Sequence, residues 1–538
     1  MSASLLVVIS ILVFLAGYIW YGRFLTRKFD LNRGNPTPAH TRRDDVDYCP
    51  AKTPVLLGHH FASIAGAGPI LGPIYAAVFG WVPVFLWILV GSLFIGGVHD
   101  FSSLIASIRH GGKSIGEVIE DHIGKAGKRL FLIFAWFTLV LVVAVFCKIV
   151  ASTFQTTPQA ATSSILFIVL AVVFGASIYR WRVPLGLATL VGIVLLFGCV
   201  VLGIRFPIHL SYNAWIALLF GYIFVAAVTP VWILLQPRDF LSSFLLYSVL
   251  LGGVVGIFVT NPKITLPAIT RFHTDLGLLF PILFVTVACG AISGFHSLVA
   301  SGTTSKQLNF EPDARVVGYG SMLIEGVLAV VALITAVTAV GLLKDDYYQW
   351  VRSEGPITIF SKGVGRFIST LGIPERAGIT FAALSISAFC LTTLDTATRL
   401  ARFVFQEFFE REEKSSILSG NRYVGTLVTI LFAGLLTFSG TSSTLWPLFG
   451  SANQLLAAIA LLAVTVWLAE LQKKNRFVKI PMYFMFCVTL TALGSLIYKN
   501  LTARNWTLFL IAILLFGIAI LLVLQARKSL RRIKRTVR

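Results

Sequence analysis

The chain has 538 residues, of which 57% are hydrophobic and only 12% are charged, and its mean hydropathy is +0.85. This composition is typical of an all-α polytopic membrane protein and excludes an ordinary soluble domain. The formal net charge of +21 does not indicate a nucleic-acid partner, because the basic residues lie in short loops between apolar runs.

Fifteen apolar runs approach the length of about 20 residues that a helix needs to cross the hydrocarbon of a bilayer. We therefore predict about 15 transmembrane helices, numbered here as spans 1 to 15. Segment 357–373 is amphipathic and too polar to count, so we expect it to lie along the surface or to re-enter. The predicted spans are residues 4–22, 57–80, 83–107, 130–150, 162–178, 184–204, 213–235, 241–260, 277–299, 317–342, 377–397, 422–438, 443–468, 480–498 and 505–525.

The basic residues predict the orientation of the chain. If the N-terminus lies outside, the loops that face the cytoplasm hold 33 of the 44 Lys and Arg residues, and the outer loops hold 10. This asymmetry follows the positive-inside rule and predicts a cytoplasmic C-terminus. The basic tail 527–538 is expected to meet anionic membrane lipids rather than nucleic acid, and segment 399–414 is expected to form an amphipathic helix at the interface.

Span 2 is interrupted in its middle by glycine and proline. It reads Ala65-Gly66-Ala67-Gly68-Pro69, and both glycine and proline destabilise a helix interior. A break leaves backbone groups unpaired, and each costs several kcal/mol in hydrocarbon, so a break is tolerated only against protein or a water-filled cavity. His59 and His60 lie just before the break. Titratable groups inside a span are candidates for a functional site.

Span 7 carries a second interruption, at Thr229-Pro230, and the motif Gln236-Pro237-Arg238-Asp239 closes it. Spans 2 and 7 are antiparallel and five spans apart. This is the pattern of a five-plus-five inverted repeat, in which two broken helices frame the substrate at the midplane. We predict one repeat in spans 2–6 and the other in spans 7–11, with span 1 and spans 12–15 peripheral. The corresponding units are an N-terminal span with its loop (1–56), a transport core (57–400) and C-terminal peripheral helices with a basic tail (401–538).

His99 and Asp100 lie near the inner end of span 3. A carboxylate inside a span needs a partner, which His59, His60 or His99 could supply. Two interpretations stay open at this point: a structural His–Asp pair that joins helices, or a group that handles protons, since histidine titrates in the physiological range.

Span 9 is rich in small and hydroxyl-bearing residues. Ser293 and Ser297 alternate with glycines at helical spacing, which is typical of a helix-packing face. His296 and the tail Thr303-Thr304-Ser305-Lys306 exceed what packing requires. Hydroxyls there could coordinate a cation or bind a carboxylate, and Lys306 could supply positive charge.

Further polar residues enter the later spans. Glu325 lies within span 10, and Asn453-Gln454 in span 13 predicts an interhelical amide bond or a small re-entrant feature. Asp395 and Arg399 are four residues apart in span 11, so an ordinary intrahelical ion pair competes with an ion-coupling role.

Sequence motifs of familiar enzymes are absent. The chain has no GxxxxGK[ST], HExxH or GxSxG, so we expect neither ATP hydrolysis nor another enzyme activity, and we expect no cofactor. The histidines and Cys49 match no familiar ligand spacing, so we predict no metal site.

The stretch CPAKTPVLLGHHFASIAGAGPILGPIYAAVFGWVPVFLWILVGSLFIGGVHDFSSL, residues 49–104, resembles the carbon-starvation protein A family. The stretches LLQPRDFLSS, SGFHSLVASGTTSKQL and FCLTTLDTATRLAR are also similar to that family. The resemblance implies a solute importer of the bacterial inner membrane, for peptides or for pyruvate driven by protons. It also implies a LeuT-like fold, which agrees with the inverted repeat expected from the broken spans. Two substrates within one family leave the solute open.

These observations predict a secondary active transporter that imports a small carboxylate-bearing nutrient, pyruvate or a short peptide, by proton symport with alternating access. Sodium bound between spans 2 and 9 is the alternative ion, and a nutrient sensor without net transport is the alternative class. The predicted substrate-binding residues are His59, His60, Ala65, Gly66, Gly68, Pro69, Thr229, Pro230, Gln236, Ser293 and His296. The predicted ion- or proton-coupling residues are His60, His99, Asp100, Ser297 and Asp395.

Overall fold

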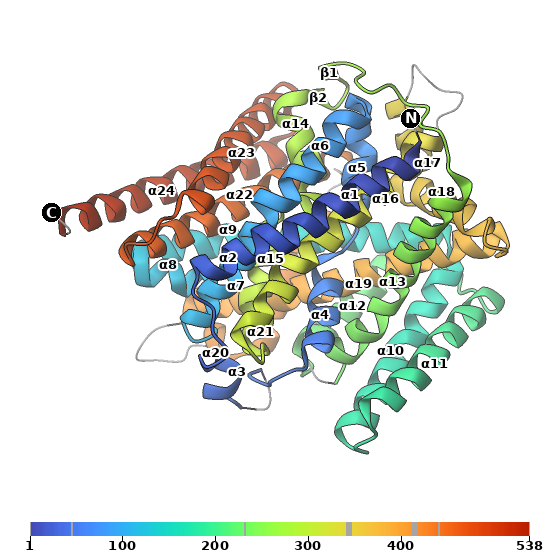
Figure 1. The fold of residues 1–538 in the computed structure, drawn as a ribbon, viewed down its shortest axis with the longest axis horizontal. Helices are drawn as coiled ribbons and strands as arrows, with labels where there is room; N and C mark the ends of the chain where they lie inside the picture. The colour runs from blue at the N-terminus through green and yellow to red at the C-terminus, as the bar shows by residue number, and fades with distance from the viewer. Residues whose placement is uncertain are drawn as a thin grey trace.

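Apolar helices make up nearly the whole of the computed structural model, which describes residues 2–44, 47–230, 233–339, 347–410, 417–438 and 442–536. In the N-terminal half, the helices are α1 (Ala3–Ala16), α2 (Gly22–Lys28), α3 (Pro38–Thr41), α4 (Thr53–Ile64), α5 (Gly68–Ala76), α6 (Trp81–Gly91), α7 (Gly97–Arg109), α8 (Ile115–Ile123), α9 (Lys125–Thr156), α10 (Pro158–Tyr179), α11 (Leu185–Arg205), α12 (Tyr212–Val228) and α13 (Leu235–Thr260). Figure 1 shows the whole chain, with its two termini at separate edges of the bundle.

A short antiparallel hairpin separates these helices from the rest, formed by β1 (His273–Thr274) and β2 (Gly277–Leu278). The helices that follow are α14 (Leu279–Val287), α15 (Gly294–Gly302), α16 (Ser321–Ala339), α17 (Tyr347–Glu354), α18 (Pro356–Ser369), α19 (Glu375–Phe409), α20 (Ile417–Gly420), α21 (Arg422–Phe438), α22 (Ser442–Glu470), α23 (Arg476–Thr502) and α24 (Trp506–Thr536).

Twelve helical segments of the described chain are long and apolar enough to cross a membrane, and the bent pair α4–α5 raises the number to thirteen. Two further apolar helices, α12 and α21, have 17 residues each. The chain is therefore a multi-pass helical membrane protein, while the predicted count of about 15 spans stays a prediction. Segment 357–373 corresponds to the amphipathic helix α18, which packs on α13 and α19. The predicted interfacial segment 399–414 is described only to residue 410, as the end of α19.

The predicted interruption of span 2 is confirmed. Helix α4 ends at Ile64 and α5 begins at Gly68, and the two axes differ in direction by 45°. Residues 65–67 between them, called here the first interruption, are all buried. The break therefore lies against protein and away from lipid, as the cost of unpaired backbone groups requires.

The predicted break at Thr229-Pro230 is present, but it ends a helix and does not interrupt one at mid-depth. Helix α12 ends at Val228, because Thr229 precedes a proline and adopts an extended conformation. Helix α13 begins at Leu235, so the motif Gln236–Asp239 lies in its first turns and closes no span. The chain is instead interrupted at residues 288–293, called here the second interruption, between α14 and α15 of span 9.

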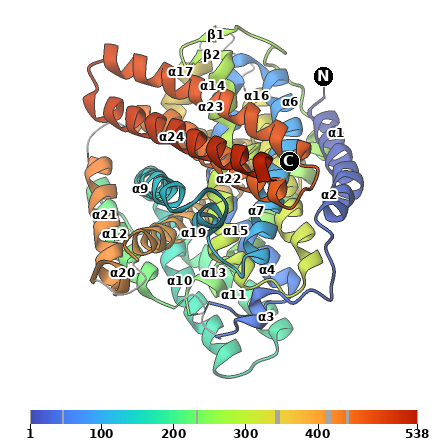
Figure 2. The same ribbon diagram turned by 90° about the vertical axis from the view of Figure 1, so that its left-hand side faces the viewer.

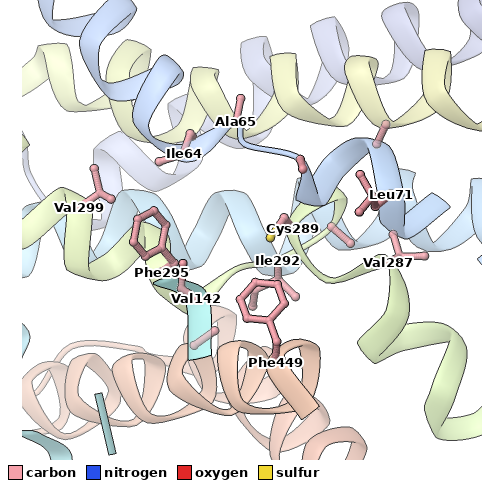
Figure 3. Packing of buried hydrophobic residues seen from close by; sticks show 14 of the residues in the cluster. Ile64, Ala65, Leu71, Val142, Val287, Cys289, Ile292, Phe295, Val299 and Phe449 are labelled. Atoms are coloured by element: carbon pink, nitrogen blue, oxygen red, sulfur yellow. The ribbon is translucent and has the colours of Figure 1, made fainter. Parts of the chain in front are cut away.

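The two interruptions lie against each other, on segments that run in opposite directions. Helix α5 packs on α14 and on residues 288–290, while α4 packs on α15. In Figure 1, α5 and α14 lie toward the β1–β2 hairpin, and α4 and α15 lie farther from it. Figure 3 shows Ala65 of the first interruption across from Cys289 and Ile292 of the second. The contact is close because glycines face it: a Cβ on Gly68 would lie 2.5 Å from Sγ of Cys289.

The helices that are buried in the core are not all those that the sequence analysis assigned to it. The most apolar window of α22 is 94% buried, although spans 12–15 were expected to be peripheral. Conversely, the corresponding window of α11 is only 33% buried, and Figures 1 and 2 show the hairpin α10–α11 at an edge of the bundle away from α24. The division at residues 56 and 400 stays a prediction.

Candidate functional site

Four buried titratable residues from three helices meet beside the two interruptions, and we call them the Asp100 cluster. They are His99 and Asp100 of α7, His296 of α15 and Glu325 of α16, and each is 0% exposed. Nδ1 of His99 lies 2.7 Å from Oδ1 of Asp100, and Nδ1 of His296 lies 2.8 Å from Oδ2. Nε2 of His296 lies 3.6 Å from Oε2 of Glu325. A chain of alternating carboxylates and imidazoles thus connects three helices.

The Asp100 cluster has only histidines to balance its two carboxylates. Among the described residues, no lysine or arginine forms an ion pair with Asp100 or Glu325. Burying an uncompensated charge is costly, so the cluster must hold protons on its histidines or on Glu325. Both Glu325 oxygens and Nε2 of His99 and His296 lack hydrogen-bond partners. The arrangement can therefore accept, hold and pass protons.

The adjacent residues His59 and His60 point into different surroundings. Nδ1 of His60 lies 2.8 Å from Oγ1 of Thr304, which follows α15, while its Nε2 has no partner. Nδ1 of His59 lies 3.3 Å from Oδ2 of Asp239 on α13. Helix α4, which ends at the first interruption, therefore contacts the turn after α15 through His60 and contacts α13 through His59.

A second buried network surrounds Arg238, and we call it the Arg238 cluster: Tyr222 of α12, Arg238 and Asp239 of α13, and Asp395 of α19. Arg238 donates to Oδ1 of Asp239 at 2.8 Å and forms an ion pair with Asp395. The Tyr222 hydroxyl donates to Oδ2 of Asp395 at 2.6 Å. His59 touches this cluster through Asp239, so the cluster joins four helices.

The expected intrahelical pair between Asp395 and Arg399 is wrong. Asp395 pairs with Arg238 across 157 positions of sequence. Arg399 instead donates to the carbonyl oxygens of Ala226, at 3.0 Å, and of Thr229. The last carbonyls of a helix lack intrahelical donors and carry partial negative charge, which explains why a guanidinium binds the end of α12.

We expect Arg238→Met to destabilise the purified protein by about 3–5 kcal/mol, because it leaves Asp239 and Asp395 buried without their cation. A fall in the melting temperature in detergent would measure the loss. Arg366→Met, on an exposed position of α18, is the control and should melt like the wild type. Adding Asp395→Asn to Arg238→Met should recover part of the loss, and a single variant as stable as the wild type would contradict the assigned ion pairs.

The other predicted residues are distributed among several roles. Asn453 of α22 donates to Oγ of Ser293 at 3.0 Å and accepts from the amide of Phe295 at 2.8 Å, so it holds the start of α15. This confirms the interhelical amide bond. The Ser297 hydroxyl donates to Gly294 O within its own helix. Gln236 donates to Oε1 of Gln307 at 3.4 Å.

Buried hydroxyls face the first interruption. A Cβ on Gly66 would lie 2.5 Å from Oγ1 of Thr393 and 2.8 Å from the ring of Phe146. The hydroxyls of Thr392, Thr393 and Thr396 on α19 have no hydrogen-bond partner. In the described part of the chain, no three His, Cys, Asp or Glu side chains are grouped so that they could hold a metal ion.

Sequence reasoning did not assign four of the residues that form the two clusters. Glu325 was noted only as an intramembrane acid, and Tyr222, Arg238 and Asp239 were given no site role. Glu325 carries a charge inside an apolar run, which was a usable signal, whereas Arg238 and Asp239 fall in the gap between two runs and look like loop residues. Their partners lie on other helices, and a single sequence does not reveal such pairs.

Comparisons with known proteins identify the family. The model of the family described as carbon starvation protein CstA matches residues 2–353 and 344–492. The peptide transporter CstA of Campylobacter jejuni is 34% identical over 91% of this chain and 79% of its own length. The pyruvate/proton symporter BtsT of Escherichia coli is 32% identical over 93% of this chain and 82% of its own length.

Solved structures of lower similarity also match. A crystal structure of the Eremococcus coleocola manganese transporter aligns with a TM-score of 0.49 at 14% identity, over 92% of this chain and 99% of that one. The family match covers most of the sequence and includes every residue of the Asp100 and Arg238 clusters. The chain therefore belongs to the carbon starvation protein CstA family.

Proposed function

We propose that this protein is a secondary active transporter that imports a small carboxylate-bearing nutrient, pyruvate or a short peptide, by proton symport with alternating access. The names of its relatives, peptide transporter and pyruvate/proton symporter, support this class. It lies in the bacterial inner membrane with its N-terminus outside and its C-terminus in the cytoplasm, as the distribution of Lys and Arg favours. Its ligands are the nutrient and a proton, and its basic tail, described to residue 536, meets lipid headgroups.

The observation that carries the proposal is the Asp100 cluster. In the part of the chain that the structure describes, no lysine or arginine pairs with its two buried carboxylates, so their charge depends on bound protons. His296 belongs to α15, directly after the second interruption, whereas Asp100 belongs to α7. A rearrangement of α15 during alternating access therefore changes the contact between His296 and Asp100, and with it the affinity of both groups for a proton.

The two interruptions supply the substrate site. Helices α5 and α15 each begin at an interruption, and a helix N-terminus carries partial positive charge that favours a carboxylate. Glycines and alanines at residues 65–68 and 288–294 let a ligand approach the backbone closely. Pyruvate and a short peptide both present a carboxylate of the required kind.

The transport core is a LeuT-like five-plus-five inverted repeat. The helices assigned to each repeat differ from the spans 2–6 and 7–11 predicted from the sequence. The first repeat comprises α4–α5, α6–α7, α9, α12 and α13, and the second comprises α14–α15, α16, α19, α21 and α22. The hairpin α10–α11 is then an insertion.

Segment lengths and contacts support this assignment. The segments Trp81–Arg109 and Glu311–Ala339 have 29 residues each, and Leu235–Thr260 and Leu445–Glu470 have 26 each. Helices α12 and α21 have 17 each. The members α9 and α19 pack against each other, as do the two interrupted segments.

Labelled uptake into proteoliposomes with imposed gradients tests the proposal. One proton that enters with the nutrient down a pH difference of about 1.7 units contributes about 2.3 kcal/mol, which supports roughly fifty-fold accumulation. We expect pyruvate or a dipeptide to accumulate when the outside is made acidic, and a protonophore to abolish this accumulation. Uptake that responds to neither a proton nor a sodium gradient would refute symport.

Sodium is the second candidate ion, because one observation favours it. The Thr393 hydroxyl lacks a partner and lies beside the first interruption, and hydroxyl and carbonyl oxygens suit a hard cation. Accumulation driven by a sodium gradient at equal pH on both sides would select sodium. A sensor would bind the nutrient in the same liposomes without any net flux.

A further inference from the structure

A pocket of about 540 Å³ opens between α15 and α19, apart from the Asp100 cluster. Ser301 and Gly302 line it from α15, and Phe403 and Glu407 line it from α19. The loop that leads into α8 and residues Ser419 and Gly420 of α20 complete its wall. Its volume lies within the range of about 300–1,000 Å³ that small-molecule sites occupy. It adjoins the loops rich in Lys and Arg, which the positive-inside rule assigns to the cytoplasm.

Lys306 presents its ammonium group at the wall of this pocket. Nζ lies 5.4 Å from the ring centre of Tyr48 and 5.6 Å from that of Phe403, so two aromatic faces hold it. The Lys306 backbone is also fixed, because its carbonyl accepts a hydrogen bond from the Cys49 amide at 3.2 Å. Among the described residues, no carboxylate forms an ion pair with Lys306.

The remaining charged groups of the pocket contact other side chains or water. Lys113 lies 3.5 Å from Glu117 and 3.6 Å from Asp121. Glu407 accepts a hydrogen bond from Ser114 at 2.9 Å and lies 3.9 Å from Lys128. Glu410 is exposed to solvent at the rim. Within the described ranges, Lys306 is therefore a cation on the pocket wall without a protein counter-charge.

We propose that this pocket is a second substrate-binding site, in which Lys306 binds the carboxylate of the nutrient on the cytoplasmic side of the central site. The inference rests on the proposed function for the identity of its ligand. Lys306 lies two residues after Thr304, and the Thr304 hydroxyl contacts His60. A ligand bound here is thus connected through one short turn to the helix that ends at the first interruption.

Protection of an introduced cysteine tests the site directly on purified protein. Gly420 lines the pocket, and a Cβ there would meet no atom within 4 Å, so Gly420→Cys places a thiol without a clash. In a background with Cys49→Ser, Cys199→Ser and Cys487→Ser, which leaves only buried native cysteines, a maleimide should modify this thiol, and pyruvate or alanyl-alanine should slow the reaction. Pyruvamide, which lacks the charge of pyruvate, should not.

Adding Lys306→Ala should raise the pyruvate concentration needed for protection at least about tenfold, as expected for loss of a hydrogen bond to a charged group. Lys306→Arg should retain protection, which guards against a folding defect. Lys473→Ala, whose lysine pairs with Asp30 outside the pocket, should change protection little. Absence of protection by both carboxylates, equal protection by pyruvamide, or protection unaffected by Lys306→Ala would overturn the site. Labelling requires no transport, so a protein that shows Lys306-dependent protection yet never accumulates nutrient would refute only the proposed function.

Discussion

Replacing Asp100 by asparagine is expected to abolish concentrative uptake while leaving the folded protein in the membrane. Asparagine keeps the shape of the side chain and can still hydrogen-bond to His99 and His296, but it cannot take up a proton. Gradient-driven accumulation, up to roughly fifty-fold in the wild type for a pH difference of about 1.7 units, should fall to the level of simple equilibration. Labelled uptake into proteoliposomes under an imposed pH gradient measures this change.

Two comparisons keep this prediction specific. Asp275→Asn removes an exposed carboxylate near the β1–β2 hairpin and should leave accumulation unchanged. Exchange of labelled for unlabelled nutrient without a gradient should persist in Asp100→Asn, because exchange needs no net proton movement. Full accumulation by Asp100→Asn would remove Asp100 from the coupling mechanism.

Gly72→Ala is expected to destabilise the protein by about 3 kcal/mol, at the upper end for overpacked sites. Gly72 of α5 faces the end of α14, and an added Cβ would lie 2.7 Å from Thr286 O and 2.9 Å from the Val287 backbone. These are backbone atoms, which cannot turn aside as a flexible side chain would. The two interrupted segments would have to move apart. A lower melting temperature in detergent would measure the resulting loss of stability.

Gly198→Ala in α11 is the matched control for this prediction. Gly198 is exposed, and its added Cβ would meet no atom within 4 Å. Alanine there should leave the melting temperature unchanged or raise it slightly, since alanine favours a helix by about 0.5–1 kcal/mol over glycine. If Gly72→Ala melts no lower than Gly198→Ala, the close contact between α5 and α14 is not a determinant of stability.

The sequence predicted one interruption correctly and misplaced the other, for physical reasons. Residues 66–69 combine glycine with proline, so their own backbone preferences disfavour a helix. Residues 288–293 contain no proline, and their small side chains look like an ordinary packing face. Their break is accompanied by a close contact with α5, and contacts between distant segments are not visible in local sequence.

Hydropathy likewise could not separate the core from the periphery. The most apolar window of α24 has a mean hydropathy of 3.2 but is only 33% buried, whereas that of α22 has 1.9 and is 94% buried. Lipid is as apolar as a protein interior, so helices that face lipid are under no pressure to be less hydrophobic. The polar Asn453 of α22, which binds the start of α15, was the better indicator of burial.

Histidine and aspartate inside span 3 correctly drew attention to the Asp100 cluster, because a charge in a membrane segment needs a partner. The partner on α15, His296, was predicted for the substrate, and its contact with Asp100 across 196 positions could not be inferred. The same limit applies to Asp395. It pairs with Arg238 on another helix, and the predicted pair with the nearby Arg399 does not form. Sequence spacing predicts pairs within one helix, whereas these pairs form between helices that pack together.

Proton entry measured together with nutrient entry tests the central claim most directly. Proteoliposomes that enclose a pH-sensitive dye should acidify inside when pyruvate or alanyl-alanine is added outside to the wild type at equal starting pH. The Asp100→Asn variant should give no such signal. Nutrient that enters and accumulates in the wild type without any acidification would contradict coupling through the Asp100 cluster.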